Sequence, residues 1–536
     1  MTKNLTIDKS KIPNYVTRVT ETLEKAGFEA FLVGGCVRDL IIEREPKDWD
    51  ITTNAKPEEI IPLFEKTIYE NKFGTVGVCI PVENVTCVTP ENAPNNVTCE
   101  TKYHILEVTP YRTEAKYSDF RHPDEINFSE NIEDDLKRRD FTINALAYSP
   151  AIALAKEGNP NKGPADGIPV AGRQEDEHSN GHLIDLFNGV KDIKDKVVRA
   201  VGSANDRFQE DALRMLRAIR FSVQLDFAMS YDTMQAIVEN SALIKNISFE
   251  RIRDEFTKII ESGNPVAGIG LLQKLGLLKY IIPELEEGIG CEQKGAHIYD
   301  VWEHLLHALD HAVIKGWPLE VRLAALFHDI GKPRSRRVGI KKEYTFYGHE
   351  VIGERITKKI MERLKYPKKT SDLVNRLVRG HMFFSDTEMI TLSAVRRVVA
   401  NVGKEHIWDL MNVRECDRVG MKKKETPYRL RKYHAMIEEV LRDPISVGQL
   451  AIDGKYMMEV LHMKPGPRMG WILSALLEEV LDDPKKNTKE HLSELVASLN
   501  MLGDDELKTL GERGKEKKEE LEKEEITKLH KKHGVS

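Results

Sequence analysis

The sequence lacks several features that mark broad classes of protein. None of its apolar runs approaches the roughly 18 residues of a membrane span, and its polar N-terminus, MTKNLTIDKSK, has no signal-peptide core. Its six cysteines, at positions 36, 79, 87, 99, 291 and 416, form no CxxC pair, so they favour neither a zinc site nor disulfides. We therefore expect a cytoplasmic chain with no membrane contact.

The overall charge also lacks the basic excess that would indicate a nucleic-acid partner. The net charge is −6, although basic stretches stand at 331–342 and 421–432. These stretches are either solvated faces or a weak candidate for an RNA track. With 536 residues, of which 40% are hydrophobic, the chain exceeds one ordinary core, so we expect several domains.

The stretch GGCVRDLIIEREPKDWDI, residues 34–51, combines two adjacent glycines with two closely spaced aspartates. FEAFLV before it is typical of a buried strand, VRDLII of a helix, and DWDITTN of a second strand. On that second strand Asp48 and Asp50 would project from the same face. Two neighbouring carboxylates repel each other unless a cation lies between them, so the pair indicates either bound divalent metal or a solvated acidic edge.

The glycines favour the metal interpretation. A turn of Gly34 and Gly35 at a helix start exposes backbone N–H groups to a triphosphate, and Arg38 adds positive charge one turn later. Triphosphate, carboxylates and Mg²⁺ together describe nucleotidyl transfer by two metals about 4 Å apart. One metal would activate an attacking hydroxyl, and the other would neutralise the leaving pyrophosphate.

The pattern GGxxRD…DWDI resembles the nucleotidyltransferase motif of class II tRNA CCA-adding enzymes and bacterial poly(A) polymerases. Further stretches match in that family's order, at 107–128, 134–148, 185–202, 210–221 and 247–259. The resemblance spans residues 12–500 and implies an enzyme that extends the 3′ end of tRNA with CTP and ATP. The segment 113–128 favours full CCA addition, because it resembles the loop that the family needs for the switch to adenine.

The resemblance implies roles for individual residues. Asp48 and Asp50 would hold Mg²⁺. Glu107 is either a third catalytic acid on a neighbouring strand or a salt-bridged structural residue. Arg139 would reach the triphosphate, Asp140 the ribose hydroxyl, and Asn144 would brace the pocket. The nucleotide-binding residues expected in the head are Gly34, Gly35, Arg38, Arg139, Asp140 and Asn144.

The segment EDALRMLRAIR would select the base. We expect Asp211 and Arg214 at i and i+3 on one helical face, with Arg217 and Arg220 continuing the row as further nucleotide-binding residues. Cytosine and adenine both offer an amino donor beside a ring-nitrogen acceptor, so a carboxylate and a guanidinium match both bases. A surface ladder of ion pairs is the alternative interpretation.

A second constellation follows the order H…HD…H…H…D and resembles the HD superfamily of metal-dependent phosphohydrolases. Its expected metal ligands are His304, His328, Asp329, His349, His381 and Asp417. Imidazole and carboxylate ligands suit a divalent transition metal such as Mn²⁺ or Ni²⁺. The resemblance implies hydrolysis of 2′,3′-cyclic or terminal phosphates, and a degenerate HD fold without metal is the alternative.

We expect an α+β fold, with an N-terminal nucleotidyltransferase head built on a small mixed or antiparallel sheet, then an all-α neck, an HD body and a tail. The predicted ranges are the head at 1–205 with insertions at 81–103 and 150–180, the base-recognising and RNA-binding neck at 206–290, the HD domain at 291–430, the tRNA-binding tail at 431–505, and a charged helix or disordered tail at 506–536. Two functions compete with CCA addition. One is a poly(A) polymerase or a partial enzyme that adds only CC or only A. The other is an HD phosphohydrolase whose N-terminal half only binds RNA. The sequence indicates no protein partner.

Overall fold

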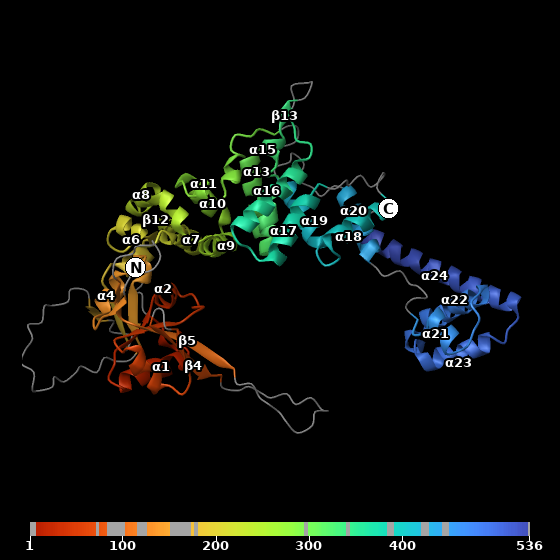
Figure 1. Cartoon of the computed structure of the whole chain (residues 1–536), viewed down its shortest axis with the longest axis horizontal. Helices are drawn as coiled ribbons and strands as arrows, with labels where there is room; N and C mark the ends of the chain where they lie inside the picture. The colour runs from red at the N-terminus through yellow and green to blue at the C-terminus, as the bar shows by residue number, and fades with distance from the viewer. Residues whose placement is uncertain are drawn as a thin grey trace, which may run out of the picture. The chain divides into compact units, whose positions relative to one another are not determined.

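A computed structural model describes residues 7–70, 74–82, 102–114, 126–150, 173–175, 181–293, 298–338, 344–382, 391–419, 428–441 and 450–533. The chain divides into two compact units, residues 1–295 with 299–375, and residues 376–536 with 296–298. A part built on a sheet comes first and is followed by a succession of helices (Figure 1). The predicted α+β fold is confirmed. The insertions predicted at 81–103 and 150–180 lie almost wholly outside the described residues.

The N-terminal part, which we call the head, is built on a mixed sheet with the strand order β3-β4-β5-β2-β1-β8-β10-β9. Neighbouring strands run antiparallel except β2 and β5, which run parallel. The strands are β1 (Ala30–Val33), β2 (Asp50–Thr53), β3 (Thr67–Glu70), β4 (Thr75–Pro81), β5 (Tyr103–Pro110), β8 (Leu146–Ser149), β9 (Arg173–Glu175) and β10 (His182–Asp185). The pair β6 (Arg112–Glu114) and β7 (Ile126–Phe128) stands apart from this sheet.

The helices of the head follow the local sequence signals. The helix predicted over 12–26 is α1 (Asn14–Lys25), which buries Val16, Val19 and Leu23. The glycine turn leads directly into α2 (Gly35–Ile41), as predicted, and α3 (Pro57–Ile60) begins with proline followed by two glutamates. The remaining helices of the head are α4 (Ile132–Lys137) and α5 (Gly189–Lys194). Short 3-10 helices lie at Lys9–Lys11, Ile61–Leu63 and Thr142–Asn144.

The described residues of the predicted neck are helical apart from β12 (Ala228–Met229), which pairs in parallel with β11 (Val197–Val198) of the predicted head. Its helices are α6 (Ala204–Glu210), α7 (Leu213–Leu225), α8 (Tyr231–Asn240), α9 (Phe249–Ile260), α10 (Pro265–Lys274), α11 (Leu278–Ile281) and α12 (Pro283–Glu286), with a 3-10 helix at Ser241–Asn246. The expectation of one continuous helix face through 211–220 is wrong, because Asp211 is extended (φ −138°, ψ 103°) and separates α6 from α7.

The HD region begins with helices that belong to the first unit. They are α13 (Val301–Ile314), α14 (Leu319–Phe327), α15 (Lys332–Ser335) and α16 (His349–Arg363), with a small hairpin of β13 (Arg337–Val338) and β14 (Tyr344–Thr345). The division between the two units falls within α17 (Lys368–Gly380). The second unit continues with α18 (Leu392–Val402), α19 (Ile407–Asp417), α20 (Tyr428–Leu441), α21 (Gly454–Glu459), α22 (Pro467–Asp482), a 3-10 helix at Pro484–Lys486, α23 (Lys489–Leu499) and α24 (Asp504–His533).

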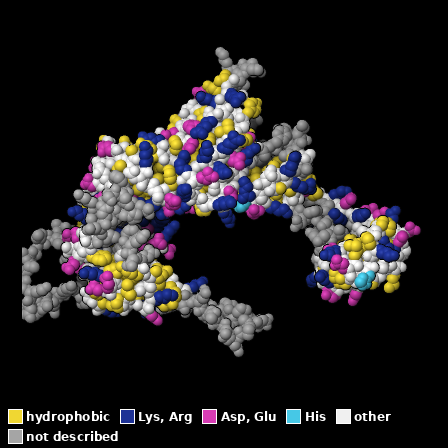
Figure 2. Space-filling model, in the orientation of Figure 1, with side chains coloured by type: hydrophobic (Ala, Val, Ile, Leu, Met, Phe, Trp, Pro, Cys, Tyr) yellow, Lys and Arg dark blue, Asp and Glu magenta, His cyan; other side chains and the backbone are white. Residues whose placement is uncertain are grey.

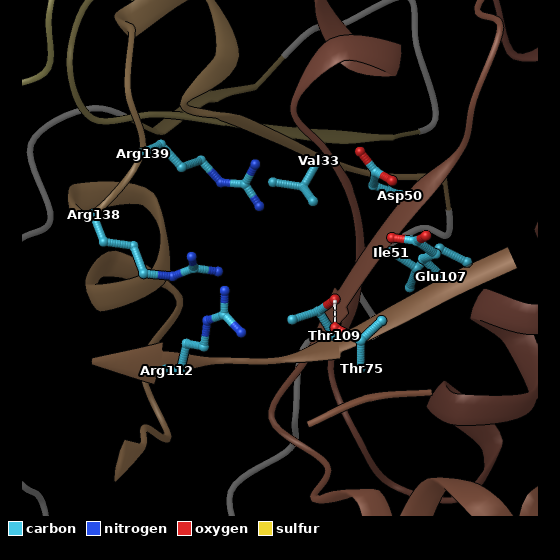
Figure 3. A pocket seen from close by; sticks show the side chains of 9 residues that line it. All are labelled: Val33, Asp50, Ile51, Thr75, Glu107, Thr109, Arg112, Arg138 and Arg139. Atoms are coloured by element: carbon cyan, nitrogen blue, oxygen red, sulfur yellow. Dashed lines mark hydrogen bonds between the residues drawn. The ribbon is translucent and has the colours of Figure 1, made fainter. Parts of the chain in front are cut away.

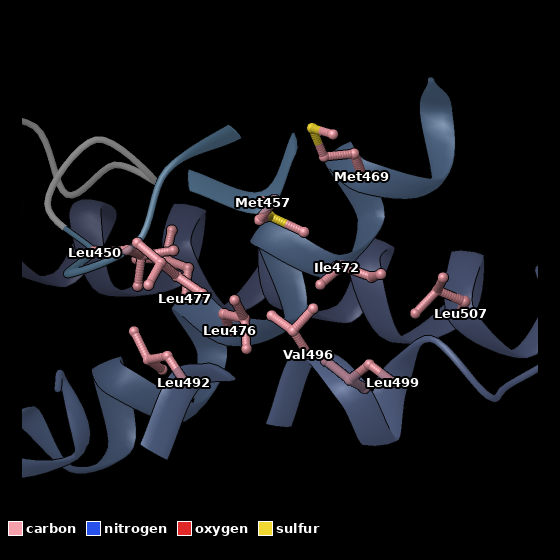
Figure 4. Packing of buried hydrophobic residues seen from close by; sticks show 11 residues of the cluster. Leu450, Met457, Met469, Ile472, Leu476, Leu477, Leu492, Val496, Leu499 and Leu507 are labelled. Atoms are coloured by element: carbon pink, nitrogen blue, oxygen red, sulfur yellow. The ribbon is translucent and has the colours of Figure 1, made fainter. Parts of the chain in front are cut away.

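The last helix, α24, is part of a hydrophobic core, although its sequence is mostly charged. Leu507 of α24 is fully buried among side chains from 450–499 (Figure 4). Gly511 and Gly514 allow close packing on α22, since a Cβ at Gly514 would lie 2.2 Å from the carbonyl oxygen of Ser474. Of the two alternatives for 506–536, the helix is the one the structure shows.

The described surface carries charges of both signs. Lys and Arg side chains are interspersed with Asp and Glu over the helices between α6 and α17 on the face drawn in Figure 2. Of the basic stretches singled out in the sequence, residues 331–338 and 428–432 are described. In the first of them Arg334 pairs with Glu287 at 2.5 Å. Among the described residues, no helix is both long and apolar enough to cross a membrane.

Candidate functional site

Acidic residues meet where the parallel strands β2 and β5 lie side by side. Asp50 opens β2 and stands in register with Glu107 of β5. Asp48 precedes the strand, which corrects the expectation that both aspartates lie on it, because pairing along β2 begins only at Asp50. Burial raises the pKa of Asp50, Arg139 lowers it, and the Glu107 and Asp48 carboxylates raise it further. Three oxygen donors that repel one another suit a hard divalent cation.

Three arginines face these carboxylates across a pocket with a volume of about 290 Å³ (Figure 3). Arg112 comes from β6, and Arg138 and Arg139 directly follow α4. Thr75 and Thr109, whose hydroxyl oxygens are 3.2 Å apart, line the same pocket. An acidic wall opposite a basic one is suited to an anionic substrate held together with metal ions.

A buried carboxylate and a glycine shape the basic wall. Asp135 accepts hydrogen bonds from Arg138 Nη2 at 2.5 Å and Arg139 Nη2 at 3.0 Å. Burial alone would raise the pKa of Asp135, but Arg139 and Arg138 outweigh it and lower the pKa. Gly34 has φ +82°, and a Cβ there would lie 3.0 Å from Arg139 Nη1 and 3.8 Å from Asp50 Oδ2. The glycine therefore keeps the space between Arg139 and Asp50 open.

Arg38, Asn144 and Asp140 form a buried hydrogen-bonded chain and do not line the pocket. Arg38 donates to Asp39 Oδ1 at 2.7 Å and to Asn144 Oδ1 at 2.6 Å. Asn144 donates to Asp140 Oδ1 at 3.2 Å, and Arg217 donates to Asp140 Oδ2 at 2.7 Å. Burial alone would raise the pKa of Asp140, but its arginine neighbours, Arg217 above all, lower it. The expected bracing role fits this chain, and direct nucleotide contacts stay predictions.

The base-selecting pair predicted in the neck is held by tertiary contacts. Asp211 accepts the backbone N–H of Leu213 at 3.0 Å and Arg251 Nη2 of α9 at 2.7 Å. Arg214 donates to Glu210 at 2.5 Å and to the backbone carbonyl of Arg138 at 3.1 Å. This last bond joins the neck to the basic wall of the pocket.

The two arginines further along α7 are not arranged as a surface ladder. Arg220 is only 7% exposed and pairs with Glu255 of α9 at 2.8 Å. Burial lowers the pKa of Arg220 to about 10. The guanidinium carbons of Arg220, Arg38 and Arg217 lie 4.2, 5.2 and 5.5 Å from the ring centroid of Phe221. These contacts fix the position of α7 against the head.

In the HD region the first unit brings four predicted ligands together. His304 of α13, His328 and Asp329 after α14, and His349 at the start of α16 are all buried. Asp329 Oδ2 lies 3.3 Å from Nε2 of both His304 and His328, and its Oδ1 lies 3.2 Å from His349 Nε2. Burial alone would raise the pKa of Asp329, but Lys332, 2.5 Å away, and His328 hold it well below its usual range.

The ring orientations favour a cation at this cluster. Nδ1 of His328 and Nδ1 of His349 lie 2.8 and 2.7 Å from backbone carbonyls, so these nitrogens carry the protons. Their Nε2 lone pairs then point toward the carboxylate of Asp329, an arrangement that a metal ion or a further proton would stabilise. His381 and Asp417 belong to the second unit, where both are buried. Their places among the ligands stay predictions.

Comparison with known proteins identifies the domains and the family of the chain. The family model of the Poly A polymerase head domain matches residues 30–158, that of the "probable RNA and SrmB-binding site of polymerase A" matches 226–289, and the HD domain matches 301–411. A CCA-adding enzyme of Lactobacillus delbrueckii subsp. bulgaricus is 32% identical over 483 residues, which cover 89% of this chain and 96% of that protein. The chain belongs to the family of CCA-adding enzymes.

Other CCA-adding enzymes give the same result. That of Lactobacillus johnsonii is 41% identical over 242 residues, covering 45% of this chain and 48% of that protein. The crystal structure of the Bacillus stearothermophilus CCA-adding enzyme in complex with CTP is similar with a TM-score of 0.53 and 26% identity, over 90% of this chain and 96% of that one. Membership in the family makes this chain a nucleotidyltransferase, and together with the HD domain it implies divalent metals.

Sequence reasoning about this CCA-adding enzyme missed several residues that shape its sites. Asp135 and Arg138 stand in the run DDLKRRD, where the i,i+3 spacing of carboxylate and guanidinium was a readable signal. Lys332 had the same kind of signal, because it stands three residues after Asp329. Arg112 and Arg251 had no comparable local signal, because each meets its site through the fold.

Proposed function

We propose that the chain adds C, C and A to the 3′ end of tRNA from CTP and ATP, without a nucleic-acid template. The observation that carries the proposal is the in-register pair of Asp50 and Glu107, which faces three arginines across one pocket. Its relatives are named CCA-adding enzymes, and one of them was solved with CTP. We keep the sequence-based domain ranges, with head, neck, HD domain and tail, as part of this proposal.

In the proposed reaction, the triphosphate lies against Arg112, Arg138 and Arg139, whose guanidinium groups match its charge. The terminal ribose oxygen of the RNA forms a bond to the α-phosphorus as the bond from that phosphorus to the bridging oxygen breaks. Pyrophosphate leaves, and the hydroxyl proton passes to solvent. Asp48, Asp50 and Glu107 would hold two Mg²⁺ ions, which supply activation of the hydroxyl and neutralisation of the leaving pyrophosphate.

Base choice rests on Asp211 and Arg214. The carboxylate of Asp211 would accept from the amino group of cytosine or adenine, and Arg214 would donate to the adjacent ring nitrogen. Arg251 and the Leu213 backbone N–H hold the carboxylate in one orientation. Guanine and uracil present a carbonyl and a ring N–H at the corresponding positions, so both contacts would be lost.

The test is to incubate the protein with tRNA lacking CCA and with each nucleoside triphosphate, alone and together, and to sequence the 3′ ends. The expected product ends in CCA. An adenine tail would identify a poly(A) polymerase. Products that end in CC, or addition of A alone, would identify a partial enzyme. No extension under any condition would leave only the RNA-binding interpretation of the head.

The cluster of three histidines and Asp329 favours a second activity, a metal-dependent phosphohydrolase that acts on 2′,3′-cyclic or terminal phosphates. Its nitrogen-rich ligands suit Mn²⁺ or Ni²⁺ better than Mg²⁺. His328→Ala should remove the bound metal and the hydrolysis of a 2′,3′-cyclic phosphate while sparing CCA addition.

His307→Ala is the matched control for the HD site. His307 lies on the same helix as His304 but stacks on Tyr299, with ring centroids 4.2 Å apart. Full-length protein that takes up neither Mn²⁺ nor Ni²⁺ and hydrolyses nothing would leave the HD fold with a structural role only.

A further inference from the structure

The sheet face that carries the carboxylates continues past them as a strip of exposed side chains. Ile68 of β3 pairs in register with Gly77 of β4, and Gly77 pairs with Glu107 of β5. Paired residues share a face of the sheet, and so do residues two apart on one strand. Ile105 therefore follows Glu107 on this face. We call Lys66, Ile68, Gly77, Tyr103 and Ile105 the carboxylate-edge strip.

The strip is apolar at its centre and open to solvent. Ile105 is 60% exposed and Ile68 is 48% exposed, whereas Val76 and Val78 on the opposite face of β4 are fully buried. The two isoleucines meet over the glycine, since a Cβ at Gly77 would lie 3.4 Å from Ile105 Cγ2 and 3.6 Å from Ile68 Cβ. The glycine thus lets the two side chains form one flat surface directly beside Glu107.

The far end of the strip is basic. The ammonium of Lys66 lies 4.0 Å from the ring centroid of Tyr103, which is the next residue after Ile105 on this face. Two strand residues span about 7 Å and four span about 13 Å. Beginning at the Glu107 carboxylate, the face therefore presents an apolar surface about 7 Å along the strand and a cation about 13 Å along it.

We propose that the carboxylate-edge strip seats the 3′-terminal nucleotide of the RNA primer, an inference that rests on the proposed function. Such a nucleotide offers matching groups: a 3′-hydroxyl for the carboxylates, a base with an apolar face for the isoleucines, and a backbone phosphate on its 5′ side for Lys66. The three pocket arginines face Asp50 and Glu107 (Figure 3). Along the chain Ile105 precedes Glu107, whereas Arg112 follows it just after the end of β5. Primer and triphosphate thus approach the carboxylates from opposite sides, as attack on the α-phosphorus requires.

The test compares the variants Ile105→Ser, Ile68→Ser and Lys66→Ala with the wild type and with a control, Ile314→Ser. Ile314 is also exposed, at 73%, but it lies at the end of α13 in the HD region. The measured quantities are kcat and KM for tRNA lacking CCA and for CTP. We expect Ile105→Ser to raise the primer KM by about three- to tenfold, the loss expected for one partly covered aliphatic side chain. The KM for CTP should stay within twofold of the wild type.

A primer whose terminal nucleotide is abasic gives the sharper measurement. With the wild-type enzyme, the abasic primer should have a KM raised by the same factor as the ordinary primer shows with Ile105→Ser. With the abasic primer, Ile105→Ser should raise the KM no further, because both changes remove the same contact. Additive losses would overturn the seating of the base. An unchanged primer KM in all three strip variants, or a change in the CTP KM alone, would also overturn it. A wild type that extends no primer would instead overturn the proposed function.

Discussion

Replacing Asp211 by asparagine should turn the base-reading position from a hydrogen-bond acceptor into a donor. The two carboxylate oxygens of Asp211 are not equivalent. Oδ1 accepts from the backbone N–H of Leu213 at 3.0 Å and from Arg251 Nη1 at 3.4 Å, and Oδ2 accepts from Arg251 Nη2 at 2.7 Å. An asparagine keeps its one amide oxygen where two donors meet, at the Oδ1 position. Its NH₂ group then takes the Oδ2 position and gives up the bond from Arg251 Nη2.

The size of the effect follows from one reversed hydrogen bond. An NH₂ group opposes the amino group of cytosine and matches the carbonyl of uracil. A correct pairing at a base edge contributes about 1–3 kcal/mol, which corresponds to a shift of roughly five- to 150-fold in the ratio of kcat/KM for CTP to that for UTP. The Asp211 side chain is only 15% exposed, so solvent screening reduces this range little.

The assay is single-nucleotide addition to tRNA lacking CCA, with CTP and UTP measured separately at limiting concentration. Asp226→Asn is the matched control. Asp226 is exposed, and its backbone has the left-handed conformation (φ 57°), which asparagine adopts readily. A CTP to UTP ratio within twofold of the wild type in Asp211→Asn would show that this carboxylate does not read the base.

Three further predictions concern the head and neck. Asp48→Ala or Asp50→Ala should abolish nucleotide addition and leave tRNA affinity in a filter-binding assay nearly unchanged, because phosphate contacts dominate that affinity; near wild-type addition would refute the metal-holding role. Asp135 has a lowered pKa when folded, so its stabilising contribution is full above the unfolded pKa of about 3.9 and is lost as the pH falls through the folded value. Asp135→Asn should therefore unfold more easily in urea at pH 7 and lose less stability than the wild type on acidification, whereas equal acid sensitivity would contradict this. Glu255→Ala leaves Arg220 buried without its partner and should lower the free energy of unfolding by about 3 kcal/mol, and a double variant with Arg220→Met should recover much of it; a loss below about 1 kcal/mol would show that the pair is not buried in solution.

Local signals were sufficient for the scaffold of the head. The run from FEAFLVGG to DWDITTN places a strand, a glycine turn, a helix and a strand, and the structure has β1, α2 and β2 there. Each of these elements depends on apolar periodicity and turn residues within a few positions, which the sequence displays directly. The break at Asp211 also had a local signal that the helical periodicity concealed, since aspartate is a preferred residue just before a helix and here bonds the N–H of Leu213.

The register of β2 with β5 was not available from any local pattern. Asp50 and Glu107 are 57 positions apart, and they become neighbours only because β5 pairs in parallel with β2 on one side and antiparallel with β4 on the other. The same holds for the partners of Asp211, because Arg251 approaches from another helix. Sequence motifs therefore predicted candidate residues for the chemistry but not which residues hold them in place.

The sequence by itself determined the chemical inventory of this protein: adjacent glycines and carboxylates for a metal and a triphosphate, histidines with aspartate for a second metal, and the order of motifs that placed the chain in its family. Tertiary structure alone decided the partner and burial of each charge. In the folded chain Arg38 bonds Asn144, Arg220 pairs with Glu255, and the exposed isoleucines lie beside Glu107 on the sheet. The physical reason is that side-chain identity fixes what a group can bind, whereas pKa, orientation and accessibility depend on neighbours that only the folded chain brings within a few ångströms.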